Sequence, residues 1–204
     1  MAVQTSRRYD SSVFLNCPFE QNYKPILDAI MFCIQDCGFV TRIALQDVGG
    51  TPRLAKIIEM IRLSRYSIHD LSLMETTRLN MAFECGIFTG AREFGQGLQK
   101  RKDLLVLDGV PHRYRATISD ISGQDAAIHN NNPVDAINCV RGFLAKKSGK
   151  RVPGAEYIVR RYQRFCSVLP AFAEAAKLSL TELNSLEYLP DLANVMATWQ
   201  QIDS

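Results

Sequence analysis

The chain has 204 residues, of which 47% are hydrophobic, and its formal net charge is +3. This length and composition fit one globular domain with an appendage, or two small domains, with room for a sizeable core. The charge is too small to argue for nucleic acid as a partner, and no apolar run approaches a membrane span.

Cysteine usage and the N-terminus indicate the compartment. Six cysteines occur, none in a Cys-x-x-Cys pattern, and no signal peptide precedes the first apolar segment. Cys33 and Cys37 share one helix face and could in principle bind a metal, but no second pair at metal spacing accompanies them. We therefore expect reduced core thiols, no metal site and a cytoplasmic protein.

Strand-like apolar runs alternate with amphipathic helical patterns over the first 145 residues or so. The predicted strands are 12–15, 39–45, 66–70, 103–107 and a short 126–129. The predicted helices are 23–37, one capped by Thr51 with a stripe of Leu54, Ile57, Ile58 and Ile61, one starting at Asn80, and one starting at Pro133. This alternation predicts an α/β fold with a parallel sheet covered on both sides.

The alternation stops near a linker at 146–153. Helical patterns then cover 155–169, 171–178 and 190–202, so the sequence predicts an α/β domain at 1–146 and a helical extension at 154–204. The extension carries Arg160, Arg161 and Arg164 among aromatic residues. These arginines indicate either a surface for a partner or for nucleic acid, or an amphipathic helix with a solvated basic face, and we favour the last interpretation.

The helix that begins near Asn80 contains an acid among apolar residues. Asn80 is a good N-cap, and Phe83 and Ile87, with Gly86 and Gly90, are predicted to face the sheet. Glu84 then falls at the end of the first turn, where the helix dipole favours its ionised form. Alternatively, Glu84 is a solvated residue at the edge of an amphipathic helix.

Polar residues should meet at the carboxyl ends of the strands, where parallel sheets bind ligands. Asp70 and Asn80 are suited to bind hydroxyls, Phe19 to stack on a ring, and Glu84 to lie beneath an anomeric carbon. Each residue also has a purely structural interpretation. Asp70 would then start a turn, Asn80 would cap a helix and Phe19 would cover the core, without any contact with a ligand. The predicted substrate-binding residues are Asn16, Pro18, Phe19, Asp70 and Asn80.

A carboxylate in such a cleft suits cleavage of an N-glycosidic bond. The reaction passes through an oxocarbenium-like sugar, which Glu84 could stabilise by its charge or attack to form a covalent intermediate. Neither a Gly-x-Gly-x-x-Gly motif nor a phosphate-binding loop occurs, which disfavours a redox site of the Rossmann type and a phosphate-loop nucleotide hydrolase. Ser-His-Asp chemistry is also unsupported, because no nucleophile elbow lies near a histidine.

Three segments resemble a known family. Phe14-Leu15-Asn16-Cys17-Pro18-Phe19, Tyr66 to Ser72, and Arg78 to Gly86 with its Asn-x-x-Phe-Glu-x-Gly pattern resemble the bacterial TIR-like domains and the related nucleoside deoxyribosyltransferase-like proteins. The resemblance covers about residues 12–144. It implies a flavodoxin-like, doubly wound sheet with Glu84 as the catalytic carboxylate. Cys85 and Cys17 depart from the family pattern, which leaves the substrate open.

In the TIR-like branch, the resemblance implies that NAD is the substrate, with no resident cofactor, and that the setting is often antiviral defence. We therefore expect an enzyme that cleaves the nicotinamide–ribose bond of NAD or makes an ADP-ribose-derived signal. The alternatives are a deoxyribosyltransferase-like enzyme, a non-catalytic nucleotide sensor, and an assembly module in which Glu84 only supports packing. We further expect a homo-oligomer, and a defence partner bound through the C-terminal helices.

Overall fold

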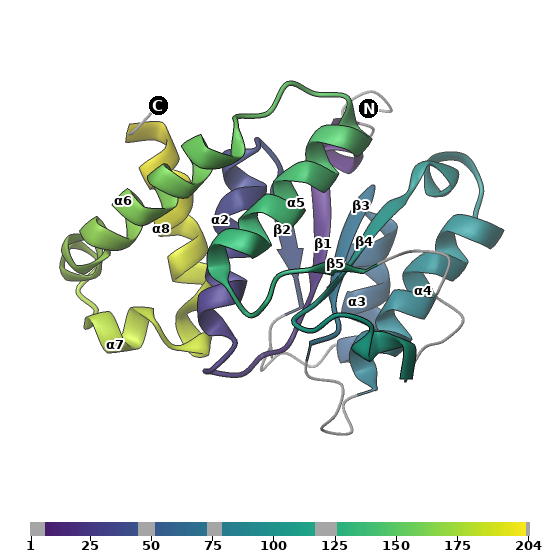
Figure 1. The fold of residues 1–204 in the computed structure, drawn as a ribbon, viewed down its shortest axis with the longest axis horizontal. Coiled ribbons are helices and arrows are strands. Elements are labelled where there is room, and N and C mark those ends of the chain that lie inside the picture. The colour runs from purple at the N-terminus through teal and green to yellow at the C-terminus, as the bar shows by residue number, and fades with distance from the viewer. Residues whose placement is uncertain (1–6, 45–51, 73–78, 117–125, 203–204) are drawn as a thin grey trace. The chain divides into compact units, whose positions relative to one another are not determined.

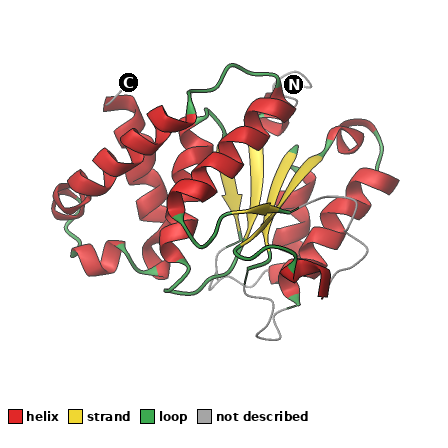
Figure 2. Cartoon of the chain, in the orientation of Figure 1, coloured by secondary structure: helices red, strands yellow, loops and turns green. Residues whose placement is uncertain are grey.

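A computed structural model describes residues 7–44, 52–72, 79–116 and 126–202 of the chain (Figure 1). Its five strands form one sheet in the order β2-β1-β3-β4-β5, and every neighbouring pair is parallel (Figure 2). The strands are β1 (Ser12–Asn16), β2 (Val40–Ile43), β3 (Tyr66–Asp70), β4 (Asp103–Asp108) and β5 (Ala127–Ile128). This strand order is that of flavodoxin-like proteins, so the predicted α/β fold class is confirmed.

The helices follow the strands in alternation and then continue alone. They are α2 (Lys24–Asp36), α3 (Arg53–Arg62), α4 (Asn80–Phe94), α5 (Pro133–Ser148), α6 (Ala155–Ala175), α7 (Leu180–Leu183) and α8 (Leu189–Ile202). Short 3-10 helices, η2 (Gly97–Arg101), η3 (Arg113–Ala116) and η5 (Leu186–Tyr188), lie where the sequence analysis expected loops or no element. None of the helices in the described part of the chain has the length and hydropathy needed to cross a bilayer.

The chain forms two compact units, of which the first comprises residues 1–18 and 39–131. In this unit α3 and α4 lie side by side and pack on the sheet (Figure 1). Two apolar clusters hold them there. One is built from Phe14, Ala44, Ile57, Ile61 and Phe88, and the other from Leu71, Met81, Cys85, Val106 and Tyr114. Burial of each large side chain stabilises the fold by about 2 kcal/mol.

The second unit comprises residues 19–38 and 132–204, and its described secondary-structure elements are all helices. Its centre is α2, whose Phe32 packs against Tyr162 and Phe165 of α6. Arg161 of α6 donates to Asp36 of α2 at 3.0 Å, and both side chains are buried. The predicted division at 146–153 stays a prediction, while contacts group the C-terminal helices with α2 and α5.

Helix α4 presents a different face to the sheet than the sequence analysis predicted. Phe83 is 55% exposed, and the buried positions are Met81, Glu84, Cys85 and Phe88. This set follows the three- and four-residue spacing of one helix face, rotated from the predicted one. The correction matters for function, because it places Glu84 on the buried face.

The predicted caps of α3 and α4 are also corrected. Leu79 occupies the N-cap position of α4, so Asn80 is the first helical residue and its side chain caps nothing. Pro52 occupies the N-cap position of α3, and Thr51, the predicted cap, lies outside the described residues. Without side-chain capping, the first turn of each helix depends on tertiary contacts for its position.

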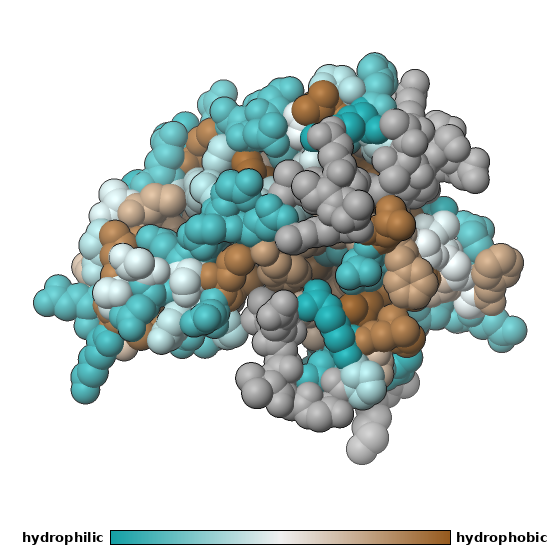
Figure 3. Space-filling view, turned by 90° about the horizontal axis from the view of Figure 1, so that it is seen from below, coloured by the Kyte–Doolittle hydropathy of each residue, from teal (hydrophilic) through white to brown (hydrophobic). Residues whose placement is uncertain are grey.

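The predicted apolar stripe of α3 is only half buried. Ile57 and Ile61 are in the core, whereas Leu54 and Ile58 are exposed. Figure 3 shows apolar side chains at the surface on the side where α3 and α4 lie. Ile57 and Ile61 form one edge of this stripe and Leu54 and Ile58 the other, and Met60 packs against the same cluster as Ile57 and Ile61, so the helix is rotated from the predicted orientation.

The sequence analysis predicted separate helices at 155–169 and 171–178, but Pro170 lies inside the single helix α6. Proline removes one backbone hydrogen bond and strains the preceding turn. The helix continues because the flanking turns are anchored by Phe165, Leu169 and Ala173, which are all buried.

Candidate functional site

Three strands of the first unit end in buried polar residues at the carboxyl edge of the sheet. Asn16 ends β1, Asp70 ends β3 and Asp108 ends β4. Parallel pairing places these ends at one edge, where Asn16 is in register with His69 and Asp70 with Leu107. Ligands bind at this edge in sheets of this kind, so the partners of these groups decide which of them can contact a ligand.

Asp70 is fully buried and is bonded on both carboxylate oxygens. Oδ1 accepts from the backbone N–H of Ser72 at 2.9 Å and from the Ser72 hydroxyl, and Oδ2 lies 3.0 Å from Nε2 of His129. The cluster ties the end of β3 to the residue that follows β5. The carboxylate of Asp70, predicted to bind substrate hydroxyls, is thus occupied by protein groups.

Asp70, Ser72 and His129 do not form a nucleophilic triad. The Ser72 hydroxyl and the Asp70 carboxylate both contact Nε2 of His129, at 2.9 and 3.0 Å respectively. Nδ1 accepts from the backbone N–H of Asn131 at 3.1 Å, so the ring proton lies on Nε2. A protonated Nε2 cannot take the proton of Ser72, and a triad needs the base to do so. The arrangement is a buried polar cluster with a structural role.

Asp108 also has protein partners on both oxygens. Oδ1 accepts from Val110 N–H at 3.2 Å and pairs with the guanidinium of Arg113, and Oδ2 accepts from Tyr114 N–H at 3.1 Å. These bonds fix the turn after β4 and the start of η3. A Cβ at Gly109 would overlap the end of the Asn131 side chain, which would have to move aside.

Asn16 joins β1 to both neighbouring elements. Its Nδ2 lies 2.9 Å from Nδ1 of His69 and donates at 2.9 Å to the carbonyl oxygen of Met81 in the first turn of α4. His69 is fully buried, and its ring lies between Phe14 and Phe88 at centroid distances of 6.0 and 5.7 Å. Burial lowers the pKa of His69 to about 3, so the ring is neutral at any physiological pH.

Glu84 differs from the other acids at this edge. It is only 6% exposed, one helical turn beyond Met81, and within the described residues its carboxylate makes no hydrogen bond or ion pair. Burial raises the pKa of Glu84 to about 7, and the positive charge of Arg53 on α3 opposes that rise. The expectation of an ionised Glu84 therefore holds only above about pH 7, because desolvation outweighs the helix dipole.

The remaining predicted substrate-binding residues lie in varied environments. Pro18 is buried, Phe19 is half-buried and Asn80 is exposed. Asn16 contacts α4, the helix that carries Glu84, whereas Asp70 binds Ser72 and His129 instead. Phe19 belongs to the second unit, and its stacking role stays a prediction.

Sequence analysis missed the partners that define these environments: Arg53, Ser72 and His129. The serine two residues after Asp70 was a usable signal, because Asp-x-Ser favours a turn in which the acid accepts from the backbone. Neither the effect of Arg53 on Glu84 nor the pairing of His129 with Asp70 had a local signal, since each joins segments that are far apart in the sequence.

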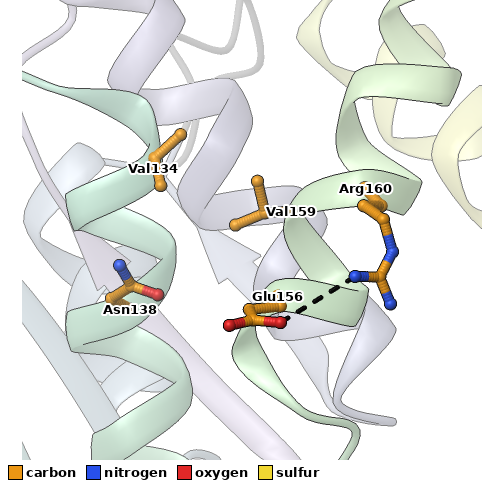
Figure 4. Close-up of a pocket in the computed structure, with 5 residues that line it drawn as sticks. All are labelled: Val134, Asn138, Glu156, Val159 and Arg160. Carbon is orange, nitrogen blue, oxygen red and sulfur yellow. Dashed lines mark ion pairs between the residues drawn. The ribbon is translucent and has the colours of Figure 1, made fainter.

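A hollow of about 310 Å³ lies between α5 and α6 in the second unit (Figure 4). Its lining is Val134, Asn138, Glu156, Val159 and Arg160. Its two charged residues, Glu156 and Arg160, form an exposed ion pair in which the carboxylate oxygen and the guanidinium nitrogen are 3.9 Å apart. Such a pair is worth little, and the hollow lacks the buried polar group that would orient a ligand. The described residues also contain no group of three side chains placed to hold a metal ion.

Comparison of the chain with protein-family models, with curated proteins and with solved structures finds no match. The geometry around Glu84 is therefore the basis for any assignment of function.

Proposed function

We propose that the protein is an N-glycosidase that uses Glu84 to cleave the nicotinamide–ribose bond of NAD or of a related nucleotide. The observation that carries the proposal is an acid that makes no hydrogen bond or ion pair with the described residues, at an edge where Asp70 and Asp108 each have protein partners on both oxygens. The resemblance of the Asn80–Gly86 segment to TIR-like domains supplies the reaction class.

The raised pKa of Glu84 suits this chemistry. A carboxylate that is little solvated interacts more strongly with a developing positive charge than one in water. Nicotinamide bound to ribose carries a positive charge, and a cation close to Glu84 lowers its pKa and favours the ionised form. The substrate itself would thus generate the carboxylate that stabilises the oxocarbenium-like sugar or attacks it.

Leaving-group chemistry explains why one acid suffices. Hydrolysis of ordinary glycosides uses two carboxylates, one to protonate the leaving oxygen. Nicotinamide leaves as a neutral base without being protonated. Asp70 therefore does not need to serve as an acid, in agreement with its bonds to Ser72 and His129.

The test compares wild type with Glu84→Gln, which keeps the size of the side chain and removes its charge. Purified protein is incubated with NAD and, separately, with deoxynucleosides, and the released base is quantified across protein concentrations. At NAD concentrations well below the KM, where Glu84 titrates in the free protein, we expect the rate of NAD loss in wild type to rise with pH through about 7 and to be at least about 100-fold lower in Glu84→Gln.

Glu93→Gln is the matched control, because Glu93 is an exposed acid on the same helix, paired with Arg92. It should retain wild-type activity. Loss of NAD that survives Glu84→Gln would reject the mechanism. Base release from deoxynucleosides alone would favour the transferase, and saturable NAD binding without turnover would favour a nucleotide sensor.

Further parts of the proposal concern assembly and setting. We infer that the chain self-associates, that its C-terminal helices recruit a partner protein in antiviral defence, and that it acts in the cytoplasm. Sedimentation of wild type over a concentration series tests self-association. A monomer with full NAD turnover would contradict it.

A further inference from the structure

Two of the buried groups at the carboxyl edge, Asn16 and His69, form a hydrogen-bonded bridge that reaches α4. Asn16 is the last residue of β1, and its amide nitrogen bridges His69 on β3 and the Met81 carbonyl on α4. All of these residues belong to the first unit. The bridge therefore joins two strands to the helix that carries Glu84.

The proton positions in this bridge follow from its chemistry. The carbonyl of Met81 can only accept, so the amide of Asn16 must turn its NH₂ group toward it. The same NH₂ group faces Nδ1 of His69, which must therefore accept. The single ring proton then lies on Nε2 and is donated to the hydroxyl of Ser67 at 2.9 Å. The two N–H bonds of the Asn16 amide and the N–H of His69 each have one acceptor, so the bridge has a single consistent arrangement.

The bridge compensates for a weak helix start. The first turn of α4 has no side-chain cap, and Leu79 and Asn80, which precede Met81, are exposed. Met81 and Glu84 are three residues apart and lie on the same buried face of the helix. Holding the Met81 carbonyl against the end of β1 thus fixes how deeply the Glu84 side chain is buried.

We propose that Asn16 and His69 are positioning residues that fix the first turn of α4 and thereby hold Glu84 in its desolvated place. The consequence for catalysis rests on the proposed function, whereas the positioning itself does not. Met81 and Phe88, which lie beside Glu84 on α4, are apolar, and among the described residues Arg53 on α3 is the charged group that acts on Glu84.

The test measures the pKa of Glu84 directly, from the chemical shift of its ¹³C-labelled carboxyl group over a pH series. The signal is assigned by its loss in Glu84→Gln. Asn16→Ala removes the bridge, and His69→Gln places an amide at the Nε2 position but leaves no acceptor at Nδ1. His69→Asn retains an acceptor at the Nδ1 position, and His129→Gln alters another buried histidine, one that bonds to Asp70 and to the Asn131 backbone rather than to Asn16.

We expect the pKa of Glu84 to fall by about one unit in Asn16→Ala and His69→Gln, as water reaches the carboxylate, and to stay within about 0.3 units in the other two. The pH profile of NAD cleavage should shift by the same amount. If Asn16→Ala does not fold, Ser67→Ala takes its place, with a smaller shift in the same direction.

An unchanged pKa in folded Asn16→Ala or, failing that, in folded Ser67→Ala would overturn the proposal. An equal fall in His129→Gln would also overturn it, because that result means general loosening. If even the wild type cleaves no NAD, the proposed function fails, and the carboxyl titration still decides the positioning role.

Discussion

Replacement of Glu84 by glutamine should make the protein more stable, and the gain should grow with pH. The folded state holds this carboxyl at a pKa of about 7 against an ordinary value of 4.5. The folded state therefore binds a proton more tightly than the unfolded chain. The contribution of this carboxyl to the free energy of unfolding is most favourable below pH 4.5 and declines as the pH rises through 7.

The size of this effect follows from linkage. Between pH 5 and pH 8, a shift from 4.5 to about 7 removes about 2.5 kcal/mol from the free energy of unfolding. Partial contact with solvent reduces this to about 2 kcal/mol. Glutamine does not titrate, so the free energy of unfolding of the variant does not fall for this reason between pH 5 and pH 8. Every other titratable group contributes equally to both proteins.

Urea denaturation at pH 5 and pH 8 measures the difference. The stability of Glu84→Gln relative to wild type should rise by about 2 kcal/mol between the two pH values. A constant difference would refute the reasoning, because it would mean that the pKa of Glu84 is ordinary in the folded state. Glu93→Gln, with its exposed carboxyl, should show no such pH dependence.

Two further predictions concern buried charges elsewhere. Lys102 is buried and donates to the carbonyl oxygens of Ile61 and Ser64, and burial lowers its pKa to about 7. Wild type should therefore gain about 2 kcal/mol over Lys102→Met between pH 7 and pH 9 in urea denaturation, and equal profiles would contradict it. Arg161→Leu should cost about 3 kcal/mol by leaving Asp36 buried without this partner, and adding Asp36→Asn should recover at least half of the loss in the same assay.

The strands were predictable because each is a short apolar run bounded by turn residues. All five lie within about two residues of their predicted positions, and four parallel pairings follow the expected alternation with helices. A fully buried strand has little freedom in its composition, which is why β1 and β3 were readable from the residues alone.

The faces of the helices were less predictable. On α4, Phe83 and Ile87 are more hydrophobic than Glu84, so hydropathy alone predicts that these two residues face the core and that the acid faces solvent. The structure turns it inward, because Met81, Cys85 and Phe88 fill the two clusters against the sheet. The pairings of Asn16 with His69 and of Asp70 with His129 depend on strand order, which no local pattern records.

Glu84 occupies a position that packing alone would give to an apolar residue. Its face of α4 is otherwise built from Met81, Cys85 and Phe88, and a leucine in its place would bury its surface without a charge to desolvate. The carboxyl instead lowers stability at neutral pH by an amount on the order of 2 kcal/mol, a large fraction of the 5–15 kcal/mol typical of a folded domain. Asp70 and Asp108 at the same edge avoid such a cost through their hydrogen bonds. A destabilising acid among saturated ones is the pattern expected where the missing partner is a substrate.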